Sequence, residues 1–442
     1  MKPFRPFLAA ALALAATVVA PAKVWTVEEA VATALRQHPD VQVARHRVEA
    51  SHALLQQVES AWQPQVILSG HYLQTNNALT ALTFTLAQRN FGYASNFDRY
   101  NRPGWVDDLG LNGKVVYNLY AGGAPTAQRQ AAGAGTRASE EDLRGVQQQL
   151  AAEVVKALLH VRKAREGVSA LEAGLRAQEA TVANARLRFA AGQVLKADLL
   201  SLEVQLARTR EALSSARHAA ALAARAFTFT LGSEPSPEPV ELAADDPGLA
   251  ALTVPGATDF SRRPELVALE ERLRMAEALV VAARAGHRPT VDAYVAGQYD
   301  QGWKFNRHAE SLEGGVTLNL NVFDGGRTAG KVRQSLAELA QAREQLRKAR
   351  LGIGLAVEQA RLAHADAVER LAVTFVAVAQ AEESASLSRA RFEQGVLLAA
   401  ELIGTESRLT EMRLGRVLAT ADERLALVQL RRALGLPFAP QP

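Results

Sequence analysis

The histidines are the first side chains to test for chemistry, because imidazole groups at suitable spacings bind transition metals. His46 and His52 lie six residues apart, which would place them on different faces of a helix. No cysteine and no paired carboxylate completes a metal site beside any of the nine histidines. The chain also shows neither a serine-nucleophile motif nor a glycine-rich nucleotide loop. The sequence therefore predicts no metal, no cofactor and no enzymatic activity.

Two acidic residues occupy matching positions. Asp198 follows Gly192 by six residues, and Glu401 follows Gly395 by the same distance. If each glycine ends one helix, each carboxylate falls in the first turn of the next. An acidic residue there interacts favourably with the helix dipole, by about 0.3–1 kcal/mol. Stabilisation of the helix terminus is one interpretation of these two acids, and a functional role is the other.

The composition is typical of long helices. Charged residues of both signs make up 22% of the chain and aromatic residues only 6%. Lys and Arg number 50 against 46 Asp and Glu, and they form no basic stripe or nucleic-acid motif. Nucleic acid is therefore excluded as an expected partner.

The N-terminus has the pattern of a secretory signal. Lys2 and Arg5 precede an uncharged run, residues 7–20, and Ala20-Pro21-Ala22 fits a small-x-small cleavage site. A membrane-spanning helix needs about 20 apolar residues, so this run is too short to span. We therefore expect residues 1–22 to be removed on export. With no cysteine in the chain, no lipid is expected on the mature N-terminus.

Most of the chain is a tandem duplication with an offset of 203 residues. Residues 186–232 align without a gap on 389–435, with 15 of 47 positions identical. A segment with five prolines separates the two copies and predicts a non-helical linker. The sequence therefore divides into five predicted parts: the signal peptide 1–22, a first repeat 23–232, a Pro-rich linker 233–260, a second repeat 261–435 and a C-terminal tail 436–442.

Each repeat should contain a helix of exceptional length. Neither of the segments 124–190 and 328–393 contains a proline in its interior, and about 65 helical residues would extend about 100 Å. Each long helix should reverse at Gly192 or Gly395 into a shorter antiparallel helix. In the second copy, steps of three and four residues predict a coiled-coil seam through Leu339, Ala342, Leu346, Ala349, Ile353, Ala356, Ala360, Ala363 and Ala367.

Before its long helix, each repeat has a first helix and then two segments of alternating polarity. The segments have about the length of tilted strands that cross an outer membrane. Sheet edges left open in lipid cost several kcal/mol for each unpaired backbone group, so membrane strands must close into a barrel. The smallest such barrels have about eight strands, so a four-stranded subunit must share its barrel with other copies. The predicted strands are 64–73, 110–121, 289–299 and 311–323.

Recurring motifs connect these elements. A double glycine, Gly122-Gly123 or Gly325-Gly326, follows the second strand of each pair and predicts a strand-to-helix turn. The helix reversals read Arg-Phe-x-x-Gly and are followed by an acid and two aliphatic residues. In this order and at this fixed offset, the motifs resemble the TolC-like outer membrane efflux protein family across essentially the whole mature chain. The segments that carry the resemblance are 188–192, 198–200, 231–232, 391–395, 401–403 and 434–435.

The resemblance implies a mostly α-helical fold with membrane β-strands, built from duplicated helical hairpins. It implies a homotrimer whose 12-stranded β-barrel lies in outer-membrane lipid and continues into a periplasmic tunnel of 12 helices. The implied partners are a periplasmic membrane fusion (adaptor) protein and an inner-membrane transporter. The chain would be the exit duct of a tripartite efflux pump and would conduct substrates passively.

The resemblance also gives roles to the helix reversals. They would form the periplasmic entrance, where three copies of Asp198 and Glu401 could form carboxylate rings that favour cations. Related channels can carry a second acid three positions further on, but this chain has Ser201 and Gly404 there, which puts a double ring in doubt. The predicted adaptor contacts are Phe189, Gly192, Val194, Leu195, Phe392, Gly395, Leu397 and Leu398.

Two alternatives remain open at this point. The duct could serve type I protein secretion, which the same sequence features would fit. In a different class, a periplasmic coiled-coil adaptor or structural protein would also have a signal peptide and long hairpins. An adaptor needs one hairpin and a compact β module, whereas this chain has two hairpins and two strand pairs, which favours the channel.

Overall fold

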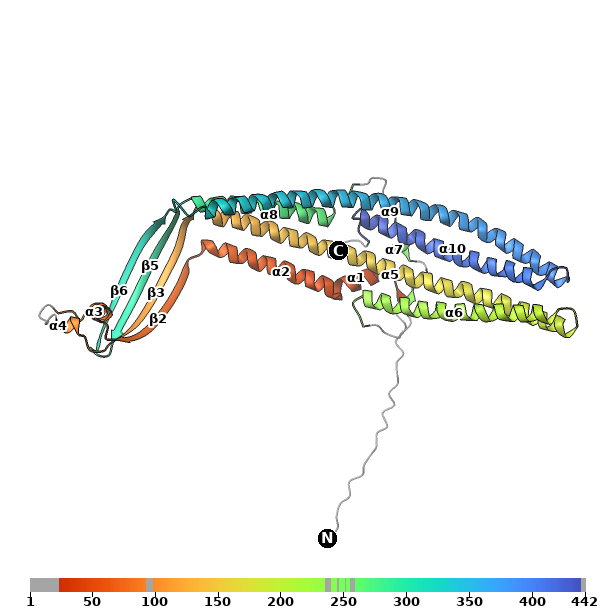
Figure 1. Ribbon diagram of the computed structural model, residues 1–442, viewed down its shortest axis with the longest axis horizontal. Coiled ribbons are helices and arrows are strands. Elements are labelled where there is room, and N and C mark those ends of the chain that lie inside the picture. The colour runs from red at the N-terminus through yellow and green to blue at the C-terminus, as the bar shows by residue number, and fades with distance from the viewer. Residues whose placement is uncertain are drawn as a thin grey trace, which may run out of the picture.

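The computed structural model describes residues 24–92, 98–234, 240–244, 246–250, 252–254 and 259–438. It is an elongated molecule with a helical bundle at one end and a β-sheet at the other (Figure 1). The predicted signal peptide and the last four residues of the predicted tail lie outside these ranges. Within them, no helix combines the length and the apolar character that a membrane crossing requires.

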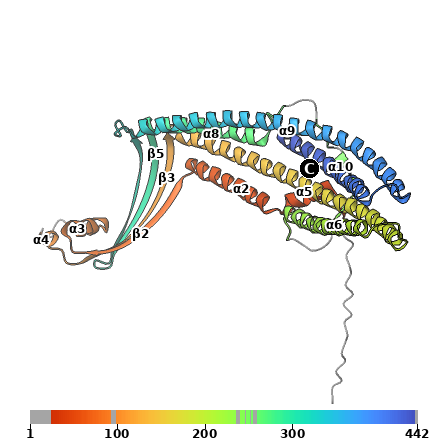
Figure 2. The same ribbon diagram turned by 45° about the vertical axis from the view of Figure 1, so that its right-hand side comes forward.

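Two pairs of helices dominate the bundle. Helices α5 (Ala124–Ala190) and α9 (Arg327–Glu393) have 67 residues each, and α6 (Lys196–Thr230) and α10 (Ala399–Ala433) have 35 each. Every boundary in the second half is the first-half boundary plus 203. At 1.5 Å per residue, α5 and α9 are about 100 Å long. The hairpins α5–α6 and α9–α10 turn at the end of the molecule opposite the sheet, which Figures 1 and 2 both show.

Shorter helices complete the bundle nearer the sheet. Helices α2 (Pro39–Glu59) and α8 (Pro264–Arg284) each begin with proline, whose fixed φ suits the first helical turn. Each runs into a 3₁₀ turn, η1 (Ser60–Trp62) or η2 (Ala285–His287). Helix α2 packs on α5, while α8 and α10 both pack on α5 and α9 and so join the two halves of the chain.

The main apolar core lies midway along the bundle, where α1 (Val27–Gln37) packs against α5. Val31 of α1, Leu158 of α5 and Phe227 of α6 are almost fully buried in it. Strand β1 (Val24–Trp25) pairs in parallel with β4 (Glu241–Leu242), and a short helix, α7 (Pro247–Ala250), adds Leu249. The linker therefore ties β1, the first described element, to the middle of the bundle.

The sheet contains one strand pair from each half. Strands β2 (Gln65–Thr75), β3 (Val106–Ala121), β5 (Thr290–Gly302) and β6 (Arg307–Asn319) form an antiparallel sheet in the order β2-β3-β5-β6. Strands β2 and β6 are its edges. The strand registers place one set of side chains on a common face, and this face is apolar and exposed: Val66, Leu68, Tyr72, Leu111, Val295, Leu312, Val316 and Leu318.

The opposite face of the sheet is polar. Its registers bring together Asn118 with Asp292, and the Asn118 amide donates a 2.7 Å hydrogen bond to the Asp292 carboxylate. Lys114 lies on the same face, with its ammonium 5.0 Å from the centre of the Tyr294 ring. The sheet therefore has one apolar face and one mostly polar face, and the edge strand β2 adds the exposed Ile67 and Leu73 to the polar face.

The predicted fold class is confirmed: long duplicated helical hairpins with four strands in one sheet. Several strand ends differ from the prediction, including the end of β5 at Gly302 rather than 299 and the start of β6 at Arg307 rather than 311. Strand β6 ends at Asn319 rather than at residue 323, because Asn319 pairs with Thr290, the first residue of β5, and no described strand lies beside 320–323. The linker is not wholly non-helical, since α7 lies within it. Strand β3 begins at Val106, four residues earlier than predicted, and pairs with the end of β2.

The coiled-coil seam on α9 is only partly as predicted. Leu339, Leu346 and Ala360 are buried, whereas Ala356 and Ala363 are exposed. Val357 is buried in place of Ala356, because it packs against Leu430 and Leu434 at the end of α10. The prediction followed sequence spacing alone, and the contact with α10 moves the buried face by one residue.

Two helices in the loop between β2 and β3 were not predicted. They are α3 (Ala78–Ala87) and α4 (Asp98–Asn101), at the far end of the sheet in Figure 1. The side chain of Asn77 caps α3 by accepting hydrogen bonds from the backbone N–H groups of Leu79 and Thr80, both at 3.1 Å. The β-branched threonines of this segment favour strand, and the cap determines helix instead.

Candidate functional site at the paired hairpin tips

Both hairpins reverse through a glycine in the left-handed region. Gly192 has φ +70° and Gly395 has φ +77°. In each turn the glycine N–H donates to the carbonyl of the phenylalanine three residues earlier, at 2.9 Å for Phe189 and 3.0 Å for Phe392. A side chain at either glycine would be strained, so the turns explain why both repeats keep the residue.

The two predicted pore acids lie in equivalent places. Asp198 is the third residue of α6 and Glu401 the third residue of α10. Glu401 is exposed and Asp198 half-buried, and neither carboxylate takes part in an ion pair within the described residues. Their first-turn positions agree with the helix-dipole interpretation. A role in a pore remains a prediction, because a single chain does not enclose one.

The tips expose apolar side chains. Leu195 is 71% exposed and Leu398 69%, while Val194 and Leu397 are half-buried. Val396, which the sequence did not single out, is 76% exposed and adds to the surface of the second tip. These side chains surround the two exposed turn glycines and give the end of the bundle an apolar surface.

The two phenylalanines of the tips differ. Phe189 is 40% exposed, whereas Phe392 is 5% exposed and packs in a core formed with residues of the first hairpin. In this conformation Phe392 therefore joins the two hairpins, and its predicted contact with an adaptor would need that core to open.

Arg188 fixes the second tip to the first. Its guanidinium donates a 2.5 Å hydrogen bond to the carbonyl of Phe392 and lies 5.4 Å from the centre of the Phe392 ring. A cation at the C-terminal end of α9 is also favourably placed with respect to the helix dipole. Arg188 belongs to the Arg-Phe-x-x-Gly motif, but the sequence pattern indicates no role for it, because its partner is 204 residues away.

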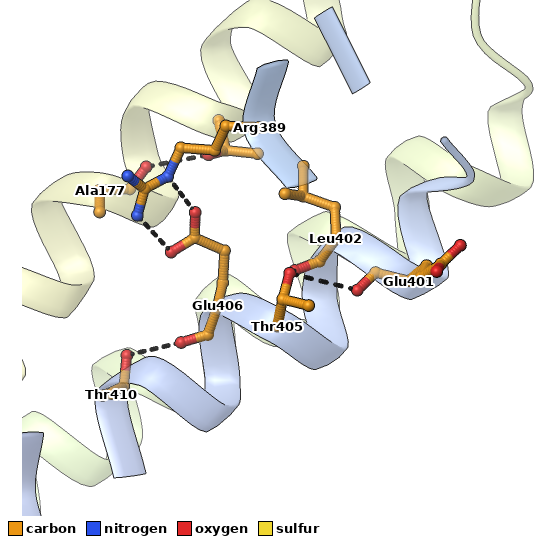
Figure 3. Close-up of polar contacts among 8 residues, drawn as sticks. Ala177, Arg389, Glu401, Leu402, Thr405, Glu406 and Thr410 are labelled. Atoms are coloured by element: carbon orange, nitrogen blue, oxygen red, sulfur yellow. Dashed lines mark hydrogen bonds and ion pairs between the residues drawn. The ribbon is translucent and has the colours of Figure 1, made fainter. Parts of the chain in front are cut away.

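An ion pair lies next to the second tip. Arg389 of α9 binds the carboxylate of Glu406 of α10 through two nitrogens, the second at 3.0 Å (Figure 3). The Glu406 hydrogen bond raises the pKa of Arg389 above its ordinary value, despite the opposing effect of burial. Figure 3 shows the Glu401 carboxylate directed away from this pair. The pair thus braces the two helices without involving Glu401.

The four predicted turn glycines lie where strands give way to helices. Gly122 and Gly123 have φ +64° and +85°, and Gly325 and Gly326 have φ +68° and +85°. In the first half, a Cβ at Gly122 would lie 2.8 Å from the Cβ of Arg288 and 2.9 Å from the carbonyl of Ala285. At Gly325 nothing lies within 4 Å. The first turn is therefore constrained by packing as well as by φ.

The α3 loop is attached to the sheet by buried polar groups. The Gln88 amide is fully buried and donates to the Asp107 carbonyl at 2.8 Å and to the Asp108 carboxylate at 2.9 Å. Asp107 in turn accepts from the backbone N–H groups of Trp303 and Lys304, at 2.8 and 2.9 Å. These contacts hold the loop at the end of the sheet farthest from the tips.

The described residues contain no group of three or more histidine, cysteine, aspartate or glutamate side chains placed to hold a metal ion. Exposed apolar side chains lie on the tips, on one face of the sheet and along α9.

Comparisons with known proteins agree with this architecture. Protein CyaE of Bordetella pertussis is 27% identical over 345 residues, which cover 73% of this chain and 69% of that protein. Outer membrane protein OprJ of Pseudomonas aeruginosa is 28% identical over 67% of this chain and 64% of its own length. Among solved structures, CusC superposes with a TM-score of 0.80 over 94% of this chain and 93% of its own, at 16% identity. The outer membrane protein VceC of Vibrio cholerae gives 0.77 over 93% and 96%, at 18% identity.

A family model described as "Outer membrane efflux protein" matches residues 30–233 and 260–436, which are the two repeats without most of the linker. Its two matched segments reproduce the duplication of the helical hairpins and strand pairs. By this match and by its fold, the chain belongs to the outer membrane efflux protein family.

Proposed function

We propose that this protein is an outer-membrane channel that conducts substrates passively from the periplasm to the exterior, as the exit duct of a tripartite efflux pump. The observation that carries the proposal is the sheet. It has an apolar, exposed face, a polar face and two edge strands, on a chain of the outer membrane efflux protein family.

The sheet supports a trimeric barrel. Backbone groups at the β2 and β6 edges would be unpaired in lipid, and closure of the sheet by other copies removes that cost. Three copies of this four-stranded sheet would give 12 strands, within the range of known outer-membrane barrels. The apolar face would contact lipid and the polar face would line the interior. The same arrangement continues α5 and α9 into a periplasmic tunnel about 100 Å long.

Aromatic side chains near the strand ends fit a membrane position for the sheet. Tyr72 and Trp303 are both more than half exposed and contact one another edge to face, with ring centres 5.7 Å apart. Trp105 is 60% exposed at the same end. Outer-membrane barrels carry such aromatic residues at the level of the lipid headgroups.

The tips support the proposed partners. Leu195, Val396 and Leu398 are each about 70% exposed or more, at the end of the molecule farthest from the sheet. An exposed apolar cluster of this kind marks a protein contact. We therefore assign the tips to a periplasmic adaptor, which would link the channel to an inner-membrane transporter. Family membership favours this arrangement over the alternative in which the chain is itself a periplasmic adaptor.

The proposal is tested with purified protein in detergent. We expect size-exclusion chromatography with light scattering to give a trimer, and planar bilayers to show stepwise conductance. Recovery of a stable monomer from the periplasmic fraction, with no conductance, would overturn the proposal. Deletion of the gene should raise susceptibility to small toxic compounds without loss of a secreted protein.

A further inference from the structure

Both hairpin tips contain the same neighbouring pair, an arginine followed by a phenylalanine. They are Arg188-Phe189 in the first hairpin and Arg391-Phe392 in the second. Within one chain only half of each pair is used, because Arg188 binds Phe392. Phe189 stays 40% exposed, and the Arg391 guanidinium forms no hydrogen bond or ion pair within the described residues. The chain therefore forms one arginine–phenylalanine contact, Arg188 with Phe392. The side chains of Arg391 and Phe189 could form a second contact of the same kind.

Arg391 occupies the same position in the second hairpin as Arg188 does in the first, and Phe189 is likewise equivalent to Phe392. All four boundaries of the long and short helices repeat at an offset of 203 residues, so a single step carries the first hairpin onto the second. That step places α10 against α5, where Lys163 binds Asp422 at 2.7 Å. If the same displacement is applied to the second hairpin, the next position must be filled by the first hairpin of another copy of the chain. In the trimer proposed above, the neighbouring subunit supplies it.

We propose that Arg391 of each subunit binds Phe189 of the next subunit as Arg188 binds Phe392 within the chain. The guanidinium would donate to the Phe189 carbonyl at the end of the neighbour's α5 and lie over the Phe189 ring. A planar guanidinium suits both contacts. The partner of this surface is a second copy of the chain, and the ring of tips is closed by two alternating kinds of arginine–phenylalanine contact. This inference rests on the trimer of the proposed function.

The contacts between subunits are weaker than those within a subunit. Phe392 packs against four apolar residues of the first hairpin, and their counterparts 203 positions later would surround Phe189. Two of the four counterparts are hydroxyl residues, and another is smaller than the residue it replaces. A hydroxyl and a smaller side chain both reduce the apolar contact around a ring. The equivalent pairs are Val182 and Ala385, Ala185 and Ser388, Leu202 and Thr405, and Leu206 and Leu409. The tips therefore separate first at the boundaries between subunits.

The test uses the absence of cysteine from the chain, which makes introduced thiols the sole reactive ones. The variant with both Phe189→Cys and Arg391→Cys is treated in detergent with a short bismaleimide and run on a denaturing gel. We expect covalent dimers and trimers. The variant with Arg188→Cys and Phe392→Cys should join its thiols within one chain and run as a monomer. The pair Phe189→Cys with Leu351→Cys is the reactivity control, because Leu351 is exposed but 40 residues from Arg391 along α9.

Size-exclusion chromatography of the same samples separates the possible failures. A trimer without covalent dimers in the Phe189→Cys, Arg391→Cys variant overturns the contact and leaves the channel intact. A monomer overturns the assembly and the contact together. A trimer in which the control pair cross-links as strongly as the test pair also overturns the contact, since proximity would then not depend on these positions.

Discussion

The guanidinium of Arg389 binds both carboxylate oxygens of Glu406, and this pair joins α9 to α10 next to the second tip. The first hairpin repeats it as Arg186 with Glu203, at 2.6 Å. The two pairs differ in burial, since the Glu406 side chain is 7% exposed and that of Glu203 is 34% exposed. The duplicated sequence has thus buried the carboxylate of one ion pair and left that of the other partly exposed.

The first prediction follows from this difference. Arg389→Ala leaves a buried carboxylate without its partner, so we expect a loss of about 3 kcal/mol in unfolding free energy. Arg186→Ala leaves a carboxylate that water can reach, and about 1 kcal/mol or less is expected. Urea unfolding of the purified protein measures both. Equal losses would show that assembly buries the two pairs to the same degree and would contradict the prediction.

The second prediction concerns the acids near the tips. Replacing Asp198 and Glu401 by alanine, singly and together, should lower the cation preference of single channels in planar bilayers, most in the double variant. Glu393→Ala is the matched control, because it removes an exposed carboxylate that lies before the second turn glycine. If current and ion preference stay unchanged in the double variant, the two acids serve only their helix termini.

The third prediction compares two turn glycines with nearly the same φ. Gly325→Ala should cost only the strain of a left-handed residue, about 1–2 kcal/mol. Gly122→Ala should cost more, because its Cβ would also meet Ala285 and Arg288 at under 3 Å. Thermal unfolding of the two variants provides the comparison. Similar losses would mean that the first turn relaxes without disturbing η2.

The fourth prediction concerns the start of α9. The Asp324 carboxylate accepts hydrogen bonds from the Thr328 hydroxyl, from the Thr328 N–H at 2.9 Å and from the Gly326 N–H at 3.0 Å. These bonds, led by that of the Thr328 hydroxyl, lower the pKa of Asp324 below its ordinary value. The stabilisation is therefore present above the ordinary aspartate pKa, and it is lost as the pH falls through the lower pKa of the folded state.

The duplicated chain provides the control for this pH effect, since Ala121 stands at the position equivalent to Asp324. Spin labels at Val322→Cys and Leu119→Cys, both exposed, report on the two strand-to-helix junctions. We expect acidification below about pH 4 to mobilise the label at 322 and not the label at 119. Equal responses at the two sites would assign the change to general acid unfolding.

Sequence patterns predicted the helices and strands whose limits are set by residues close to them in the chain. The absence of proline and the double glycines located α5 and α9 to within a residue, because an uninterrupted helix ends where its capping residues lie. The strand pairs were located from alternation, but the end of β6 was not, since it depends on where β5 begins. Helix α1 and the pairing of β1 with β4 were missed, because their stability comes from a core that gathers residues from across the chain.

In the candidate site too, features set by the local sequence were predicted and features set by packing between distant segments were not. Asp198, Glu401 and the turn glycines were found because they recur at a fixed offset. The contact between Arg188 and Phe392 could not be found this way, because it breaks the repeat by joining one copy to the other. The burial of Phe392 against the exposure of Phe189 has the same origin. Repetition predicts what the two halves share, and their packing against each other creates the differences.

In the proposed outer-membrane trimer, the open edges of the sheet would also constrain each subunit before it assembles. Until neighbours arrive, β2 and β6 offer unpaired backbone groups beside an apolar face, which is the kind of surface that nucleates aggregation. On that proposal, a lone subunit would have to reach its partners quickly or be protected by a chaperone. The rate of supply to the membrane would then govern how much functional protein a cell obtains, and overproduction would yield insoluble chains.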